Sequence, residues 1–203
     1  MSVLPITLAI DTAAPRLQLA LLRADGSADV SVDEIATGHA ELIFERIATL
    51  LAHNGVGYSD LQRVVTTTGP GSFTGLRIGL SAARGIGLAR DIAVLGVPSL
   101  LALSLAGNGA TTVLLDARRG EAYFQTFLAP GVPDGGPQLL PMAVAQQAVL
   151  PNSLLLTTPF VDIAALARYG AAADPLAHVP EATYVRDADA KPQTAARIER
   201  LNS

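Results

Sequence analysis

The sequence is short of several residue types, and each shortage excludes a class of protein. Its 203 residues contain no cysteine and no tryptophan. Without cysteine there is no disulfide framework, no thiolate zinc site and no cysteine nucleophile. Charged residues make up 16% of the chain and hydrophobic residues 50%. A disordered chain has the opposite balance, with high charge and few hydrophobic residues, so we expect a folded protein.

Long uninterrupted apolar runs are also missing, although the mean hydropathy is +0.38. The longest uncharged stretches, 92–112 and 135–161, are both interrupted by proline, glycine and asparagine. A membrane-spanning helix needs about 20 consecutive apolar residues, so we expect no membrane span and a cytoplasmic protein. The formal net charge of −4 disfavours a stand-alone nucleic-acid-binding protein, because such proteins normally carry a basic patch.

Hydrophobic periodicity predicts alternating strands and helices in the first half of the chain. The expected strands are 3–10, 17–22, 28–35, 63–68 and 92–97. The expected helices are 38–54, 74–90 and 98–106, where apolar residues recur at helical spacing. The order βββαβαβα indicates the α/β class.

A short internal repeat suggests that a second, similar domain follows. The segment Thr112–Asp116 matches Thr7–Asp11 at a constant offset, and in both an apolar strand ends in aspartate before a second strand. We therefore predict two similar βββαβα-type domains, 1–106 and 107–203. The second is smaller, with a Pro/Gly loop at 129–137 and a frayed tail from about Arg186.

Two helices carry more apolar or small surface than one sheet covers. In helix 38–54 one row is expected to face the sheet, and a second row consists of Ala40, Phe44, Ala48 and Ala52. In helix 74–90 a ridge of small residues consists of Gly75, Gly79, Ala83 and Gly87. Such a ridge lets another backbone approach closely, so both sets are candidate partner-binding surfaces. The sequence leaves open which row faces the partner and which faces the sheet.

A glycine-rich loop and two aspartates are the candidates for ligand chemistry. The loop 69–75 precedes a helix N-terminus, which favours anions, but it is neither a Walker A loop nor a Rossmann fingerprint. Possible anion- or nucleotide-binding residues are Asp11, Gly69, Gly71, Ser72 and Thr74. A tight turn is the other interpretation of the loop. The carboxylates of Asp11 and Asp116 have two interpretations. They either bind a metal or activate a water molecule, or they cap the turns that follow them.

Other polar residues show no catalytic or metal-binding pattern. The histidines are His39, His53 and His178, and none has the spacing of a metal motif. The segment 118–121, Arg-Arg-Gly-Glu, is a charged turn. We predict no catalytic residue, no metal ligand and no cofactor.

Several segments together resemble the TsaB (YeaZ) family of bacterial threonylcarbamoyladenosine biosynthesis proteins. They are Leu8–Thr12, His39 at a helix start, the string GPGSFTGLRIGL at 69–80, Gly85, Gly96–Leu100, Asp116–Tyr123 and Tyr184–Arg186. The string at 69–80 is highly specific. The resemblance is firm over about 3–105 and thinner beyond, and 129–180 is short and divergent.

The resemblance implies an actin/Hsp70-like ATPase (RNase H-like) fold and a non-catalytic role. Such a protein forms a heterodimer with TsaD, which TsaE joins, and supports threonylcarbamoyl transfer to N6 of adenosine 37 in tRNAs that read ANN codons. It contacts tRNA mainly through the complex. The apolar helix pair makes a homodimer of the isolated chain possible, and the sequence leaves homodimer and monomer open. TsaD-like enzymes hold a metal with His-x-x-x-His, and here Ser99 and Leu103 stand at those positions.

Two other functions remain as alternatives. The first is an active nucleotide-binding enzyme of the same fold, using Asp11 and the loop 69–75. The second is a peptidase, which the missing metal ligands and the missing nucleophile arrangement disfavour.

Overall fold

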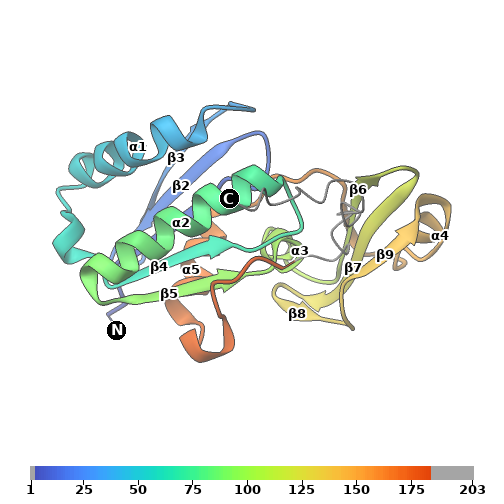
Figure 1. The fold of residues 1–203 in the computed structure, drawn as a ribbon. Coiled ribbons are helices and arrows are strands. Elements are labelled where there is room, and N and C mark those ends of the chain that lie inside the picture. Colours follow the sequence, from blue (N-terminus) through green and yellow to red (C-terminus); the bar gives the residue numbers. More distant parts are fainter. Residues whose placement is uncertain (1–2, 184–203) are drawn as a thin grey trace, which may run out of the picture.

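The computed structural model describes residues 3–183, which form two β-sheets with helices around them (Figure 1). The first sheet has the strand order β3-β2-β1-β4-β5. Strand β2 is antiparallel to both of its neighbours, β1 and β3, whereas β4 and β5 run parallel to β1. The strands are β1 (Thr7–Asp11), β2 (Leu17–Leu22), β3 (Ala28–Asp33), β4 (Arg63–Thr67) and β5 (Ala93–Val97).

Helices cover both faces of this sheet. On one face lie α1 (His39–His53) and α2 (Phe73–Arg90), side by side, and on the other lies α5 (Ile163–Ala172) (Figure 1). Every residue of β1 and β2 is buried as a result. A strand that is covered on both faces has a largely apolar sequence instead of alternating apolar and polar residues. The sequences of β1 and β2 are of this kind.

Three strands of the second sheet have the same order and directions as three strands of the first sheet. The order of the second sheet is β10-β6-β7-β8, and β9 also pairs with β7. The antiparallel β6–β7 pair and the parallel β6–β10 pair reproduce the β1–β2 and β1–β4 pairs. The elements are β6 (Thr111–Arg118), β7 (Glu121–Ala129), β8 (Val132–Pro133), β9 (Gln138–Pro141), β10 (Leu154–Leu156), α3 (Ser99–Ser104) and α4 (Met142–Gln147). Two 3-10 turns, Tyr58–Asp60 and Pro175–Ala177, are the remaining elements of the described residues.

The predicted elements differ from the structure at several ends. The strand predicted over 28–35 ends at Asp33, and the helix predicted over 98–106 spans Ser99–Ser104. The first strand begins at Thr7 rather than at Val3, because Pro5 has no N–H to donate to a ladder. The predicted loop 129–137 contains the short strand β8, and β9 follows it directly. The predicted tail from Arg186 lies outside the described residues.

Helices α3 and α5 each pack on the sheet of the other half. Helix α3 follows the first sheet in sequence and packs on β6 and β7, whereas α5 follows the second sheet and packs on β1, β2 and β4. Gly170 of α5 comes so near β4 that a Cβ there would lie 2.7 Å from the Val65 Cβ. One apolar core therefore contains residues from both sides of the predicted boundary at 106/107.

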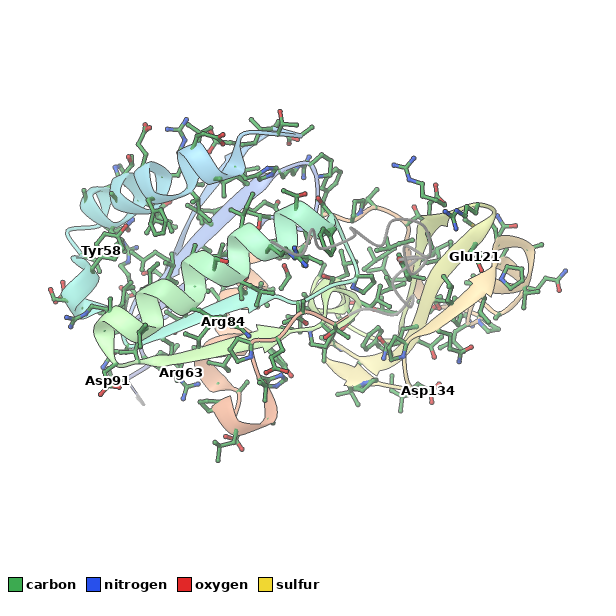
Figure 2. The ribbon with its side chains drawn as sticks, in the orientation of Figure 1. Tyr58, Arg63, Arg84, Asp91, Glu121 and Asp134 are labelled. Carbon is green, nitrogen blue, oxygen red and sulfur yellow. The ribbon has the colours of Figure 1, made fainter. Side chains whose placement is uncertain are left out.

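The chain after α5 stays on the first sheet. Arg63 of β4, labelled in Figure 2, donates from Nη1 to the carbonyls of Gly170, Ala171 and Ala173 at the C-terminal end of α5. Further on, Gly96 N donates to the His178 carbonyl over 3.0 Å. Across residues 3–183, no helix combines the length and apolarity that crossing a membrane requires.

Candidate functional site

An apolar groove lies between α1 and α2 on the helical face of the first sheet. Its volume is about 460 Å³. The walls are apolar and aromatic, with one arginine at the rim. They consist of Ala40, Ile43, Phe44, Phe73, Thr74, Arg77, Ile78, Ser81 and Ala82. Soluble monomers rarely expose a contiguous apolar patch without a binding role, so this groove is the leading candidate for a partner surface.

The structure shows which row of α1 faces the sheet. Buried positions are Ile43, Ile47, Leu50 and Leu51. The second row, Ala40, Phe44, Ala48 and Ala52, is exposed throughout. Phe44 is 53% exposed, although burying a phenylalanine side chain is favourable by about 1.5–3 kcal/mol. Ala40 and Phe44 of this row line the groove, and the whole row is exposed and available to a second protein.

The glycine ridge of α2 requires a correction. Gly75, Gly79, Ala83 and Gly87 are buried inside the chain, against the first sheet and the β1–β2 turn, and are not a surface for a partner. A Cβ on Gly75 would collide with the Thr12 carbonyl oxygen, and one on Gly87 with the Val94 side chain. A Cβ on Gly79 would lie 2.6 Å from Thr12 Oγ1. The ridge lets α2 approach its own sheet.

The solvent-facing side of α2 carries different residues, which the sequence did not single out as a surface. Leu88 is 87% exposed and Phe73 54% exposed. The Arg77 guanidinium lies 3.8 Å from the centre of the Phe73 ring. Gly85 is exposed in mid-helix, and a Cβ there would have no neighbour within 4 Å. A glycine inside a helix costs about 1 kcal/mol relative to alanine, and at Gly85 no contact among residues 3–183 explains that cost.

The glycine-rich loop is closed against the β1–β2 turn. Ser72 N donates to the Ala13 carbonyl over 2.8 Å, and Ser72 Oγ accepts from Gly75 N at the start of α2. A Cβ on Gly71 would lie 2.8 Å from the Ala13 carbonyl oxygen. Gly69 has a φ of +109°, in the region that only glycine adopts readily. These glycines allow tight packing inside the chain.

Asp11 is fully buried and has its hydrogen-bond partners inside the chain. Its carboxylate accepts from Thr67 Oγ1 at 2.5 Å, from Ala13 N at 3.2 Å and from Gln18 Nε2 at 3.3 Å. Burial raises the pKa of Asp11, and these hydrogen bonds oppose the rise. Asp11 therefore joins β1, β2 and β4 rather than facing an open site.

A second cavity, of about 510 Å³, separates the β1–β2 turn and the loop from the second sheet. Of the predicted anion-binding residues, only Gly71 and Ser72 line it. Asp11 and Gly69 do not, and Thr74 lines the α1–α2 groove instead. Across the cavity Asp116 Oδ1 accepts from Arg118 N over 2.7 Å, the turn-capping role that was one interpretation of this residue.

The positions that correspond to metal ligands in TsaD-like chains have structural roles here. Ser99 Oγ accepts from Gly69 N over 3.1 Å, and Leu103 is buried in the core. The histidines are apart: His39 Nε2 contacts the Arg16 carbonyl, and His178 Nε2 contacts the Tyr169 hydroxyl. In the part of the chain that the structure describes, no three His, Asp or Glu side chains form a metal-binding group.

Two sheets of the same central order, with an internal repeat and a cavity between them, define an α/β protein of the actin/Hsp70-like (RNase H-like) class. Residues 33–136 match the sequence model of the TsaD family, described as tRNA N6-adenosine threonylcarbamoyltransferase. The chain belongs to this family.

Individual relatives confirm the resemblance to TsaB. The chain is 34% identical over 125 residues to the tRNA threonylcarbamoyladenosine biosynthesis protein TsaB of Escherichia coli, covering 59% of this chain and 54% of that protein. An uncharacterized protein of Mycobacterium leprae is 34% identical over 211 residues, which cover 94% and 57%. The solved structure of YeaZ from Pseudomonas aeruginosa superposes with a TM-score of 0.73 at 23% identity, covering 91% of this chain and 100% of that one, and so shares the fold. The chain spans little more than half the length of these two sequence relatives.

Proposed function

We propose that this chain is a non-catalytic scaffold that binds a TsaD-type transferase in tRNA threonylcarbamoyladenosine biosynthesis. The transferase would move the threonylcarbamoyl group to N6 of adenosine 37 in tRNAs that read ANN codons. The observation that carries the proposal is the exposed apolar groove between α1 and α2, in a chain of the TsaD family. TsaB relatives, by name, belong to the same biosynthesis.

The buried polar residues support a scaffold rather than an enzyme. Asp11 has three hydrogen-bond partners inside the chain, and the loop beside it is closed against Ala13. Ser99 and Leu103 stand where relatives of the transferase type have histidines, and leucine has no atom that binds a metal. On this proposal the transferase supplies the catalytic groups and most of the tRNA contact.

The partner set follows from the same surface. We expect a heterodimer with TsaD, joined by TsaE, in the cytoplasm. The isolated chain would form a homodimer through the same groove, because one exposed apolar face serves either partner. Calorimetry of the isolated chain with ATP and Mg²⁺ tests the alternative of a nucleotide-binding enzyme, which predicts tight binding and turnover.

Depletion of the protein tests the proposal in the cell. Threonylcarbamoyladenosine in tRNA, measured by mass spectrometry of nucleosides, should fall on depletion and return when the wild-type gene is restored. A gene carrying Phe44→Arg should restore it poorly, because this substitution puts a long charged side chain in the lining of the groove. Unchanged modification after full depletion would contradict the proposed function.

A further inference from the structure

We propose that Asp11 is a positioning residue: from inside the chain it sets the place of one wall of the α1–α2 groove, through the turn between β1 and β2 and the start of α2. This inference rests on the proposed function, because it takes the binding of the partner at the groove as given. It assigns a role in that binding to a buried residue that no partner touches. Three sets of contacts connect the Asp11 carboxylate to the groove wall.

The first set joins the carboxylate to the turn that follows it. Asp11 Oδ1 accepts from Ala13 N over 3.2 Å. Thr67 Oγ1 of β4 and Gln18 Nε2 of β2 donate to the same carboxylate, and all three side chains are buried. A hydrogen bond from a backbone N–H to a carboxylate is about twice as strong as one between neutral groups. One buried charge therefore fixes the turn to the strands of the first sheet.

The second set joins the turn to the glycine-rich loop and the first residues of α2. Ser72 N donates to the Ala13 carbonyl over 2.8 Å. Thr12 Oγ1 donates to the Gly75 carbonyl over 2.7 Å. A Cβ on Gly71 would lie 2.8 Å from the Ala13 carbonyl oxygen, so the loop lies directly on the turn. A shift of the turn must consequently shift the loop.

The third set joins the loop to the groove. Ser72 is the N-cap of α2, and its side chain accepts a backbone N–H of the first helical turn. The next two residues, Phe73 and Thr74, line the α1–α2 groove, whereas Ser72 itself lines the second cavity. The backbone that carries this wall of the groove is therefore anchored on the turn that Asp11 holds.

The end of the described chain lies beside the same loop. Thr183 N donates to the Thr68 carbonyl over 2.8 Å, and a Cβ on Gly69 would lie 2.7 Å from the Thr183 carbonyl oxygen. Residues 184–203 follow directly. Every protein in the experiments below keeps the full chain, so that all variants share these residues.

Hydrogen exchange tests the contacts inside the chain. Asp11→Asn keeps the shape of the side chain but replaces the carboxylate with a weaker, neutral acceptor. The amides of Ala13 and Ser72, followed by NMR, should exchange several-fold faster. The Val65 amide in the core strand β4 should exchange at the wild-type rate or more slowly, because losing a buried charge stabilises the fold. A change in overall stability alone would move all three amides in the same direction, and that result would overturn the inference.

Binding tests the connection to the partner. The probe is the TsaD-type transferase of the same organism, titrated with the full chain. Asp11→Asn should bind about three- to tenfold more weakly, although its fold is more stable. Gly71→Ala presses on the Ala13 carbonyl and leaves Asp11 in place, so it should also bind more weakly, and it decides the role of the turn if Asp11→Asn does not fold. Asp25→Asn removes an exposed carboxylate and should bind as wild type.

The outcomes separate this inference from the proposed function. If Phe44→Arg weakens binding while Asp11→Asn and Gly71→Ala bind as wild type, the positioning role is overturned and the groove remains the partner surface. If Phe44→Arg also binds as wild type, the proposed function is overturned as well. Equal weakening by Asp25→Asn and Asp11→Asn would reflect the lost charge alone and would overturn the positioning role.

Discussion

Asp11 illustrates how a residue that points to catalysis in the sequence can serve stability instead. A strand that ends in aspartate beside a glycine-rich loop is compatible with metal or nucleotide chemistry. In the structure the carboxylate is fully buried without a cationic hydrogen-bond partner, and it accepts hydrogen bonds from Thr67, Ala13 and Gln18. Its ionised form is therefore costly to keep in the folded protein.

The pH dependence of stability follows from the raised pKa of Asp11. The folded protein holds this proton more tightly than the unfolded chain, whose aspartate has a pKa near 3.8. Ionisation of Asp11 thus destabilises the fold at neutral pH, and this penalty disappears as the pH falls through the folded pKa toward 3.8. Asp11→Asn should raise the free energy of unfolding at pH 7, with a smaller gain near pH 4, in urea titrations.

A matched control for Asp11 is Asp25, which is exposed. Hydrogen bonds from Ser27 lower the pKa of Asp25, so its ionised form contributes stability above pH 3.8, and this contribution is lost as the pH falls. Asp25→Asn should therefore not raise stability at pH 7. A lower free energy of unfolding for Asp11→Asn at pH 7 would contradict the assignment of a buried, costly charge.

Two neighbouring threonines of β4 should respond in opposite ways to valine. Thr66 Oγ1 is buried with no hydrogen-bond partner among the described residues, whereas Thr67 Oγ1 donates to Asp11. Thr66→Val should leave the free energy of unfolding unchanged or raise it. Thr67→Val should lower it by about 1–3 kcal/mol, because the Asp11 carboxylate loses a donor. Chemical denaturation of both variants checks this, and equal losses would contradict it.

At the scale of elements, α2 contains glycines with opposite roles. Gly75→Ala and Gly87→Ala should destabilise the protein, because each new Cβ collides with a neighbour on the sheet side. Gly85→Ala should stabilise it by about 1 kcal/mol, because it adds a better helix former in open space. Thermal unfolding of the three variants measures the difference. A loss of stability for Gly85→Ala would show that its space is not open.

The sequence predicted the helices and most strands, because long periodic segments and tight turns are local properties. It also identified the row of α1 that the structure leaves exposed, whose role as a partner surface stays a prediction. It could not show which small row of α2 faces the sheet, since Gly75, Gly79, Ala83 and Gly87 have too little apolar surface to indicate a side. Burial of Asp11 depends on Gln18 and Thr67, which reach it from two other strands, so no local pattern near Asp11 signals it.

At the scale of the whole molecule, the exchange of α3 and α5 joins the two halves. We propose 1–106 and 107–203 as structural halves built on the two sheets. Helix α5 covers one face of the first sheet, where it buries Ala9, Ala20 and Val65. Without α5 this face is exposed to water, which costs the first half a large part of its core.

The two halves should consequently unfold together. The full chain should show one cooperative thermal transition by circular dichroism and by calorimetry. The fragment 1–106 on its own should lack such a transition. A fragment that melts cooperatively near the temperature of the full chain would contradict the shared core.

Binding at the groove is the central claim, and a titration of the full chain with the TsaD-type transferase of the same organism tests it most directly. Phe44→Arg places a charged side chain in the lining of the groove, and Thr49→Arg places one at an exposed position of α1 outside that lining. The expected result is that the wild type and Thr49→Arg bind alike, whereas Phe44→Arg binds on the order of tenfold more weakly or not at all. Equal affinity of all three proteins, or no binding by the wild type, would contradict the claim.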